Sequence, residues 1–187
     1  MYQEPVATSK TKDKKIKIFK AHPTRNSRRG PMGEDPILVL AVDTVALTFP
    51  IERLRNQGRD VAVCSDMGQF QNLLGMPIEH WSMLIIEIEG FGGISAVIGK
   101  LMMLRQEHPN LPVLIASTRM PAHDFTLERL PICDASLALP CSASDLNVAV
   151  QNALMNNIAW QMRLEEIENA FDAEPWDDDL PALAKAG

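Results

Sequence analysis

The sequence predicts a doubly wound, parallel α/β domain over residues 36–156. Along this stretch, short runs that are apolar throughout alternate with longer segments of helical character. Strands of this kind are typical of a parallel sheet whose two faces are both covered by helices. Strand–helix alternation also predicts right-handed crossover connections between the strands. A length of 187 residues fits one such domain with appendages.

Five apolar runs predict five strands, and turn residues separate most of them from helical segments. Gly58 is placed to end the first helix, and Asp66 can cap the second, which runs to about Leu74. The expected strands are residues 37–42, 61–64, 83–88, 112–116 and 135–139. The other expected helices are residues 46–57, 94–108, a short one at 125–130, and a long last helix capped by Ser142 or Ser144.

Charge is distributed unevenly in a chain of otherwise ordinary globular composition. Nine of the 18 Lys and Arg residues fall in residues 10–29, and eight of the 24 acids fall in residues 165–179. We therefore expect a disordered basic N-terminal arm (1–35) and an acidic disordered tail (172–187). The arm is either a solvated tail or a contact for an acidic partner, nucleic acid or a lipid surface. A net charge of −6 gives no global case for nucleic acid.

Cysteine usage and hydropathy exclude several classes of protein. Cys64, Cys133 and Cys141 are odd in number and lack C-x-x-C spacing, which argues against a disulfide framework and a zinc site. Reduced thiols in a cytoplasmic protein are the plain interpretation. No apolar run approaches the roughly 18 residues of a membrane span. We expect no cofactor, no metal and no membrane association.

Four segments in this order and spacing resemble the response-regulator receiver (CheY-like) superfamily. They are residues 37–42, 83–93, 112–117 and 134–140, and the last is similar to the family's GADDYLxKP strand and turn. The resemblance covers about two thirds of the chain. It implies the flavodoxin/CheY-like strand order 2-1-3-4-5, with the functional surface at the carboxyl ends of the strands. It also implies a role in bacterial signal transduction and two-component systems.

The resemblance implies phosphoryl transfer to an aspartate, but this sequence departs from the required residues. The acidic pair that holds Mg²⁺ aligns with Ala41 and Val42, which cannot ligate a metal. Asp43, one position later, supplies at most one carboxylate. We define the phosphoacceptor corner as the five residues that align with or adjoin the family's remaining functional positions: Asp43, Glu87 at the acceptor, Ser117 and Thr118 after strand four, and Leu139 at the lysine.

These departures predict a degenerate pseudo-receiver with no catalytic residues. Without the lysine nothing balances the incoming negative charge, and Glu87 is one methylene too long for the attack geometry. Glu87 has two interpretations. Its carboxylate imitates a permanent acyl-phosphate by bonding to Ser117 or Thr118, or it is a strand-end acid that faces solvent or caps the glycine-rich loop at residues 89–93. That loop lacks a phosphate-binding motif and is expected to be an ordinary turn.

The last helix carries an apolar repeat of alternating four- and three-residue steps, which we call the inner seam. Its length predicts a helical extension at 157–171, beyond the body of the domain. We expect that the domain cannot bury Trp160 and the residues after it, so three outcomes are open: a homodimer, binding to a helix of another protein, or a bend at Asn156–Asn157 that folds the segment back. The inner seam is Leu146, Val150, Ala153, Asn157, Trp160, Leu164, Ile167 and Phe171.

Together these features predict a non-enzymatic regulatory protein that acts by protein–protein interaction, through a homodimer or a helix-mediated partner. The first alternative is a divergent receiver that still responds to phosphate or a small ligand at Asp43, Glu87 and Ser117. The second is a nucleic-acid-associated regulator that uses the basic arm, which the acidic tail disfavours.

Overall fold

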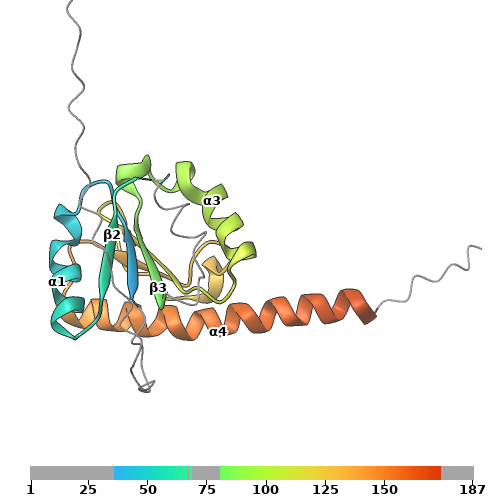
Figure 1. The fold of residues 1–187 in the computed structure, drawn as a ribbon. Coiled ribbons are helices and arrows are strands. Elements are labelled where there is room, and N and C mark those ends of the chain that lie inside the picture. The colour runs from blue at the N-terminus through green and yellow to red at the C-terminus, as the bar shows by residue number, and fades with distance from the viewer. Residues whose placement is uncertain (1–35, 67, 69–80, 174–187) are drawn as a thin grey trace, which may run out of the picture.

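The structure is a computed structural model that describes residues 36–66, 68 and 81–173. The predicted arm, most of the predicted tail and nearly all of the predicted second helix lie outside these residues. Within them the chain forms a five-stranded parallel sheet in the order β2-β1-β3-β4-β5, as the sequence predicted (Figure 1). The strands are β1 (Ile37–Leu40), β2 (Val61–Cys64), β3 (Met83–Glu87), β4 (Val113–Ser117) and β5 (Ala135–Ala138).

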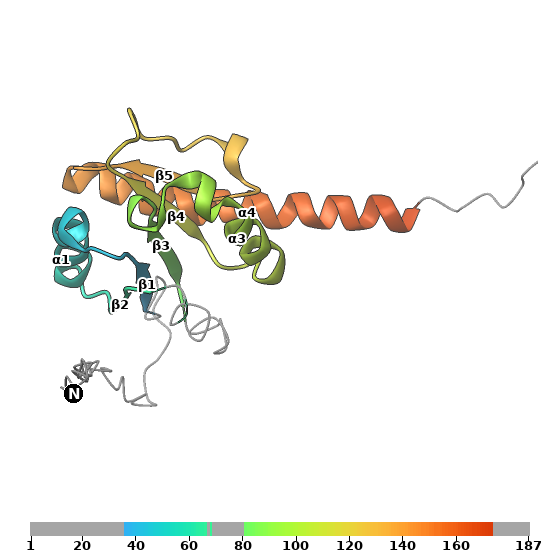
Figure 2. The same cartoon turned by 90° about the horizontal axis from the view of Figure 1, so that it is seen from above.

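Helices cover both faces of this sheet, which explains why its central strands are apolar throughout. One face of the sheet packs on α1 and α4, through residues such as Ile37 and Val39, and the other packs on α3, through Leu38 and Leu40 (Figure 2). Alternate residues of β1 therefore serve opposite cores. The helical elements are η1 (Val45–Leu47), α1 (Thr48–Asn56), η3 (Glu89–Phe91), α3 (Ile94–Glu107), η4 (Leu127–Arg129) and α4 (Ala143–Ala173).

The predicted short helix at 125–130 is only the single 3-10 turn η4. Its place is taken by a loop whose Asp124 forms an antiparallel bridge with Ser136 of β5. The side chain of Asp124 also accepts hydrogen bonds from the backbone N–H and the hydroxyl of Thr126. Because Asp124 satisfies these groups locally, the segment has less to gain from a longer helix.

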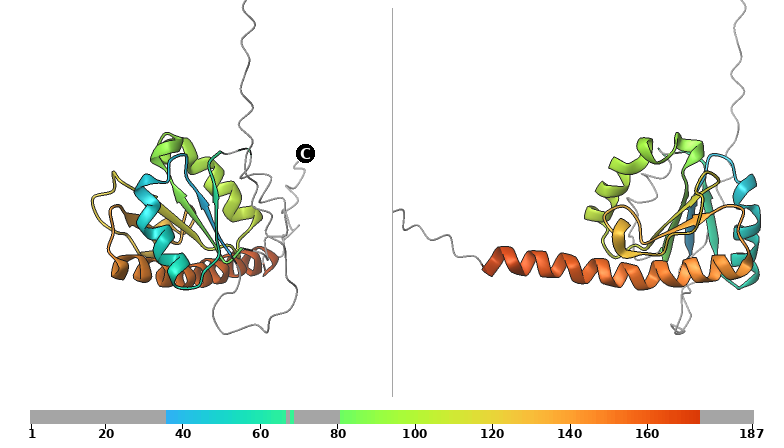
Figure 3. Two further views of the ribbon diagram at one scale, coloured as in Figure 1. Left: turned by 60° about the vertical axis from the view of Figure 1, so that its left-hand side comes forward. Right: turned by 180° about the vertical axis from the view of Figure 1, so that it is seen from behind.

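Helix α4 runs unbroken for 31 residues and projects well past the sheet (Figures 1 and 3). Its first turn is closed by a capping box, in which Ser142 Oγ accepts from the N–H of Asp145 and the Asp145 carboxylate accepts from the N–H of Ser142. The helix passes through Asn156 and Asn157 without interruption, so the bend that was one of the three open outcomes is absent. Asp172 and Ala173, predicted to begin the tail, still belong to the helix.

A buried polar cluster fixes the middle of α4 against the rest of the domain; we call it the clamp. It consists of Arg105, Asp134, Asn156, Asn157 and Trp160. Arg105 and Asp134, both with fully buried side chains, form two parallel hydrogen bonds of 2.7 Å. Burial raises the pKa of Asp134, while Arg105 and the N–H of Val113 act in the opposite direction. The pair joins the end of α3 to the start of β5.

The two asparagines and the tryptophan extend the clamp to α4. Asn156 Nδ2 donates to the carbonyl of Asp134 at 2.7 Å, and Asn157 Nδ2 donates to that of Pro109 at 3.0 Å. The guanidinium of Arg105 lies 4.9 Å from the ring centroid of Trp160. A cation above an aromatic face is attracted to it, most strongly where water is excluded.

The clamp corrects the prediction for the inner seam. Leu146, Val150, Ala153, Asn157 and Trp160, five of its eight positions, are buried within the described residues. Trp160 is only 8% exposed, so the expectation that the domain could not bury it is wrong. The physical reason is that the Arg105 guanidinium and the loop at Pro109 extend the packing surface beyond the sheet. Asn157 is buried and serves this packing.

Candidate functional site

The candidate site lies at the carboxyl ends of β3 and β4, and Glu87 is its innermost acid. Glu87 is the last residue of β3 and is 4% exposed. Its Oε1 accepts a hydrogen bond from the N–H of Glu89 at 3.0 Å, and its Oε2 accepts one from the N–H of Gly90 at 3.1 Å. Both carboxylate oxygens thus hold the loop that follows the strand. Of the two predicted roles, this geometry corresponds to the cap of the glycine-rich loop.

Glu89 makes the contact that the sequence assigned to Glu87. The 3-10 turn η3 directs the Glu89 carboxylate to the end of β4, where Ser117 Oγ donates to its Oε1 at 2.5 Å. The N–H of Thr118 donates to the other oxygen at 3.4 Å. Buried Ser117 is held further because its Oγ accepts from the N–H of Arg119 at 3.1 Å. The predicted carboxylate bridge to Ser117 and Thr118 therefore exists, but Glu89 provides it.

The pKa values of the two glutamates shift in opposite directions although the residues are only two positions apart. Burial raises the pKa of Glu87, and a side-chain hydrogen bond with Glu89 raises it further. Burial also acts to raise the pKa of Glu89, but the hydrogen bonds from Ser117 and Glu87 outweigh it, and the net shift is downward. Neither carboxylate forms an ion pair with any described residue. The pair therefore favours a proton on Glu87, donated toward an ionised Glu89.

Gly90 allows the loop after β3 to lie against the loop after β1. A Cβ at this position would meet Val42 Cβ at 2.8 Å and Glu87 Oε2 at 3.1 Å. A side chain therefore does not fit between Val42 and the Glu87 carboxylate without a shift. Val42, which stands where the resemblance places a metal-binding acid, thus supports the loop that presents Glu89.

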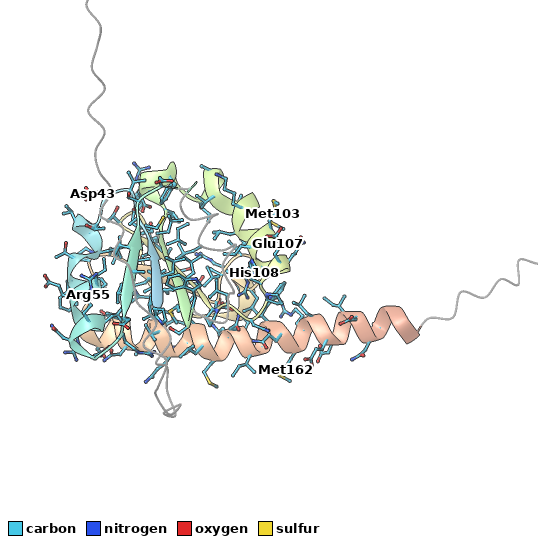
Figure 4. The ribbon with its side chains drawn as sticks, viewed as in Figure 1. Asp43, Arg55, Met103, Glu107, His108 and Met162 are labelled. Atoms are coloured by element: carbon cyan, nitrogen blue, oxygen red, sulfur yellow. The ribbon has the colours of Figure 1, made fainter. Side chains whose placement is uncertain are left out.

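The remaining members of the phosphoacceptor corner serve the scaffold. Asp43 lies at the periphery of the domain (Figure 4), where its Oδ1 accepts from the N–H of Val45 at 2.9 Å and closes η1. Leu139 packs in the core beneath α4, and its N–H donates to the carbonyl of Ser117. Over residues 36–66, 68 and 81–173, no cluster of three or more His, Cys, Asp or Glu side chains is suited to hold a metal ion.

The structure thus brings Ser117 and Thr118 together through Glu89, a residue that the sequence did not single out. Only the Glu-x-Glu spacing at 87–89, followed by a glycine, hinted at this role. In an extended strand, residues two apart point to the same face, and neither would be expected to reach a neighbouring strand's end. The 3-10 turn that begins immediately after β3 changes this direction.

The sheet order, the helix-covered faces and a site at the carboxyl ends of β3 and β4 define the class: the domain has the fold of response-regulator receiver (CheY-like) domains. A receiver domain from Clostridium thermocellum is 18% identical with a TM-score of 0.52, over 67% of this chain and 98% of its own. One from Methanospirillum hungatei is 16% identical with a TM-score of 0.52, over 67% and 97%.

A third similar structure is the beryllofluoride-activated NtrC4 receiver domain dimer, 10% identical with a TM-score of 0.53, over 65% of this chain and 98% of its own. Identities this low establish the fold and leave the chemistry to the residues of this chain. No protein-family model and no curated protein sequence matches the chain. Among the helices that the structure describes, none is long and apolar enough to cross a bilayer.

Proposed function

We propose that this protein is a non-enzymatic, regulatory pseudo-receiver of bacterial signal transduction that is not phosphorylated and signals from the cytoplasm by protein–protein contact. The observation that carries the proposal is the position of the Glu89 carboxylate. It accepts from Ser117 Oγ and is aligned with the N–H of Thr118. The receiver resemblance assigns the hydroxyl at the Ser117 position to the phosphoryl oxygens.

A phosphoryl group would meet three obstacles in this corner. Its oxygens would compete with Glu89, whose negative charge would repel them at close range. No lysine compensates, because Leu139 stands at that position and packs in the core. The acceptor itself is engaged, since both oxygens of Glu87 hold backbone N–H groups of its own loop. Phosphoryl transfer depends on preorganised groups that stabilise negative charge, and this corner instead presents the negative charge of Glu89.

The Glu89 bridge supports a domain that is held in one state. A carboxylate covalently tied to the loop after β3 keeps Ser117 in the position that a transient phosphoryl group would otherwise select. Such a domain does not switch with a phosphodonor. Its output then depends on which protein it meets, and the projecting end of α4 offers the contact surface for a second copy or another helical partner.

The proposal is tested by treating the full chain with Mg²⁺ and acetyl phosphate and measuring the intact mass. We expect no adduct, whereas an established receiver domain treated in parallel gains one. Mg²⁺ with beryllofluoride, which mimics a bound phosphoryl group, is expected to leave the melting temperature unchanged. An acid-stable or acyl adduct mapped to Glu87 or Asp43, or a clear rise in melting temperature, would instead establish the divergent but functional receiver.

A matched pair of variants distinguishes a phosphoacceptor corner that Glu89 blocks from one that lacks the groups needed for phosphorylation. Glu89→Gln keeps a side chain of the same size but removes the charge that opposes a phosphoryl group, and Glu107→Gln removes an exposed carboxylate on α3. We expect neither variant to form an adduct, because the metal-binding acids are also missing. An adduct in Glu89→Gln alone would show that Glu89 by itself blocks a site that is otherwise complete.

A further inference from the structure

We infer that α4 pairs with α4 of a second copy of this chain, antiparallel, through the face that points away from the sheet. This inference deepens the proposed function, because it identifies the protein contact. It differs from the predicted seam, which the domain itself largely buries. The surface involved, which we call the outer stripe, consists of Val148, Met155, Ile158 and Met162.

The outer stripe is exposed and regularly spaced. Val148, Met155, Ile158 and Met162 are 39%, 67%, 55% and 57% exposed. Three of them follow one another at intervals of seven residues, and Ile158 lies three residues after Met155, so all four share one side of the helix. Met162 points away from the domain (Figure 4). Clustered apolar side chains on one exposed helix face mark an interaction surface more strongly than scattered ones do.

The length of α4 indicates what covers this stripe. Ile158 is the midpoint of the helix Ala143–Ala173, and Trp160 is the last buried residue among residues 143–170, whose burial is described. Residues 161–173 therefore project about 20 Å beyond the clamp, at 1.5 Å per residue. A second α4 in the antiparallel direction, with the two-fold axis near Ile158, places Met155 against Met162 of the second copy. Each projecting end then lies along the outer face of the other copy's first half.

The charges of the helix favour this occupant. Between Leu146 and Met162 the helix contains no Asp, Glu, Lys or Arg, so the outer stripe lies on an uncharged surface. An uncharged apolar surface suits a copy of itself better than it suits the basic residues 10–29 of this chain. On this helix the positive arm would find acids only outside the stripe, at Asp145 before it and from Glu165 onward after it.

The same charges determine the direction. A parallel pair would place Glu165 and Glu166 of each copy opposite each other, where like charges repel. In the antiparallel pair these acids lie opposite Asn152 and Gln151 of the second copy, which are uncharged and can donate hydrogen bonds. The symmetric, self-complementary contact that results is the arrangement expected of a two-fold dimer.

Sedimentation equilibrium of the full chain tests the pairing. We expect a dimer for the unmodified protein and a monomer for Met155→Glu/Met162→Glu, with an unchanged circular dichroism spectrum. Met103→Glu is the matched control, because Met103 is 59% exposed but lies on α3. The control should remain dimeric. A monomeric unmodified protein, or a dimer that persists in the double variant, would overturn the inference.

Disulfide formation tests the direction in a Cys141→Ser background, which leaves only the two buried cysteines, Cys64 and Cys133. Gln151→Cys mixed with Glu166→Cys should crosslink on oxidation, whereas each variant alone should not. Self-crosslinking of Gln151→Cys alone would show a parallel pair and refute the antiparallel one.

A salt series completes the test. Association that disappears in concentrated sodium chloride, yet survives Met155→Glu/Met162→Glu, would assign the contact to the basic arm and refute the outer stripe. The phosphodonor experiment has a separate readout. A monomer that forms no adduct would refute the dimer and leave the proposed function standing. A dimer that forms an adduct would support the dimer and refute the proposed function.

Discussion

At the scale of single residues, Glu87 and Glu89 have different roles: Glu87 caps its own loop, and Glu89 contacts the neighbouring strand. Glu87 is enclosed by its own loop, and Glu89 reaches the neighbouring strand through Ser117. Burial and the neighbouring Glu89 raise the pKa of Glu87, whereas the hydrogen bond from Ser117 lowers the pKa of Glu89. Glu89 is therefore the charged acceptor for Ser117 Oγ, and Glu87 is the first of the two carboxylates to be protonated as pH falls.

The raised pKa of Glu87 predicts a specific dependence of stability on pH. Between the ordinary glutamate value of 4.5 and the raised value, the native state binds more protons than the unfolded state. The free energy of unfolding therefore falls as pH rises through this window, and the loss is complete above it. Glu87→Gln should remove that loss, so that its stability relative to the unmodified protein increases with pH.

Urea unfolding from pH 4.5 to 8 measures this difference. Glu107→Gln, which removes an exposed carboxylate from α3, serves as the control and should follow the unmodified protein. A Glu87→Gln curve parallel to that of the unmodified protein would show that Glu87 ionises normally. Below this window the lowered pKa of Glu89 acts in the opposite sense, because its contribution is lost as pH falls.

Gly90 predicts a steric coupling between the loops after β1 and β3. Gly90→Ala places a Cβ 2.8 Å from Val42 Cβ, and relieving this contact must move the loop that Glu87 caps. We expect a loss of about 1–3 kcal/mol, the usual cost of overpacking. Val42→Gly removes the opposing atoms, so the double variant should be more stable than the sum of the single losses. Additive losses in a double-mutant cycle would contradict the contact.

At the scale of elements, the clamp explains how α4 can be long and still belong to the domain. Arg105→Met leaves the carboxylate of Asp134 buried without its partner, and breaking a buried pair in this way costs about 3–5 kcal/mol. Arg105→Met/Asp134→Asn should recover part of this loss, because no charge remains buried and the N–H of Val113 keeps an acceptor. Urea denaturation of the two variants and of the unmodified protein measures the loss and its recovery.

The clamp also determines which substitutions in α4 can test dimerisation. Trp160→Glu, a substitution in the inner seam, would insert a charge beside Arg105 and Asp134. It should lower the free energy of unfolding whatever the oligomeric state, so it does not test dimerisation. Substitutions in the outer stripe test it because their side chains are exposed within the described domain.

The sequence predicted the sheet well because the evidence for it is local. A run such as Leu84 to Ile86, apolar on every residue, indicates a strand covered on both faces, and the strand order followed from the family resemblance. The helix was harder, since periodicity shows which face is apolar and not what covers it. Leu146 and Met155 lie on two apolar faces of one helix, and only the structure shows that the first is used by the domain.

The site was predictable in its position and not in its detailed contacts. Glu87 and Ser117 end strands three and four, Asp43 lies three positions after strand one, and parallel strands bring their carboxyl ends to one edge of the sheet. Which carboxylate reaches Ser117 depends on a single 3-10 turn, η3, whose direction no residue pattern at 87–89 specifies. Likewise, the pairing of Arg105 with Asp134 joins residues far apart in sequence, each of which alone resembles an ordinary surface charge.

At the scale of the whole molecule, the projecting end of α4 is expected to exchange its amide hydrogens according to protein concentration. In a monomer, most side chains of residues 161–170 are exposed, whereas an antiparallel pair covers this stretch. We expect slower exchange there at high concentration and no change in α3 (Ile94–Glu107). Hydrogen exchange followed by mass spectrometry measures both segments in one sample. Concentration-independent exchange at 161–173 would contradict the dimer.

The length of this projection also places the charges at the end of α4 far from the clamp. Asp172, in the last turn of α4, lies twelve residues after Trp160, which is about 18 Å along the helix axis at 1.5 Å per residue. At physiological ionic strength a charge is felt over a Debye length of about 8 Å. An acid at the end of α4, such as Asp172, therefore lies outside the electrostatic range of the clamp. A change of charge at that end is therefore expected to leave the pKa of Asp134 and the stability of the clamp unchanged.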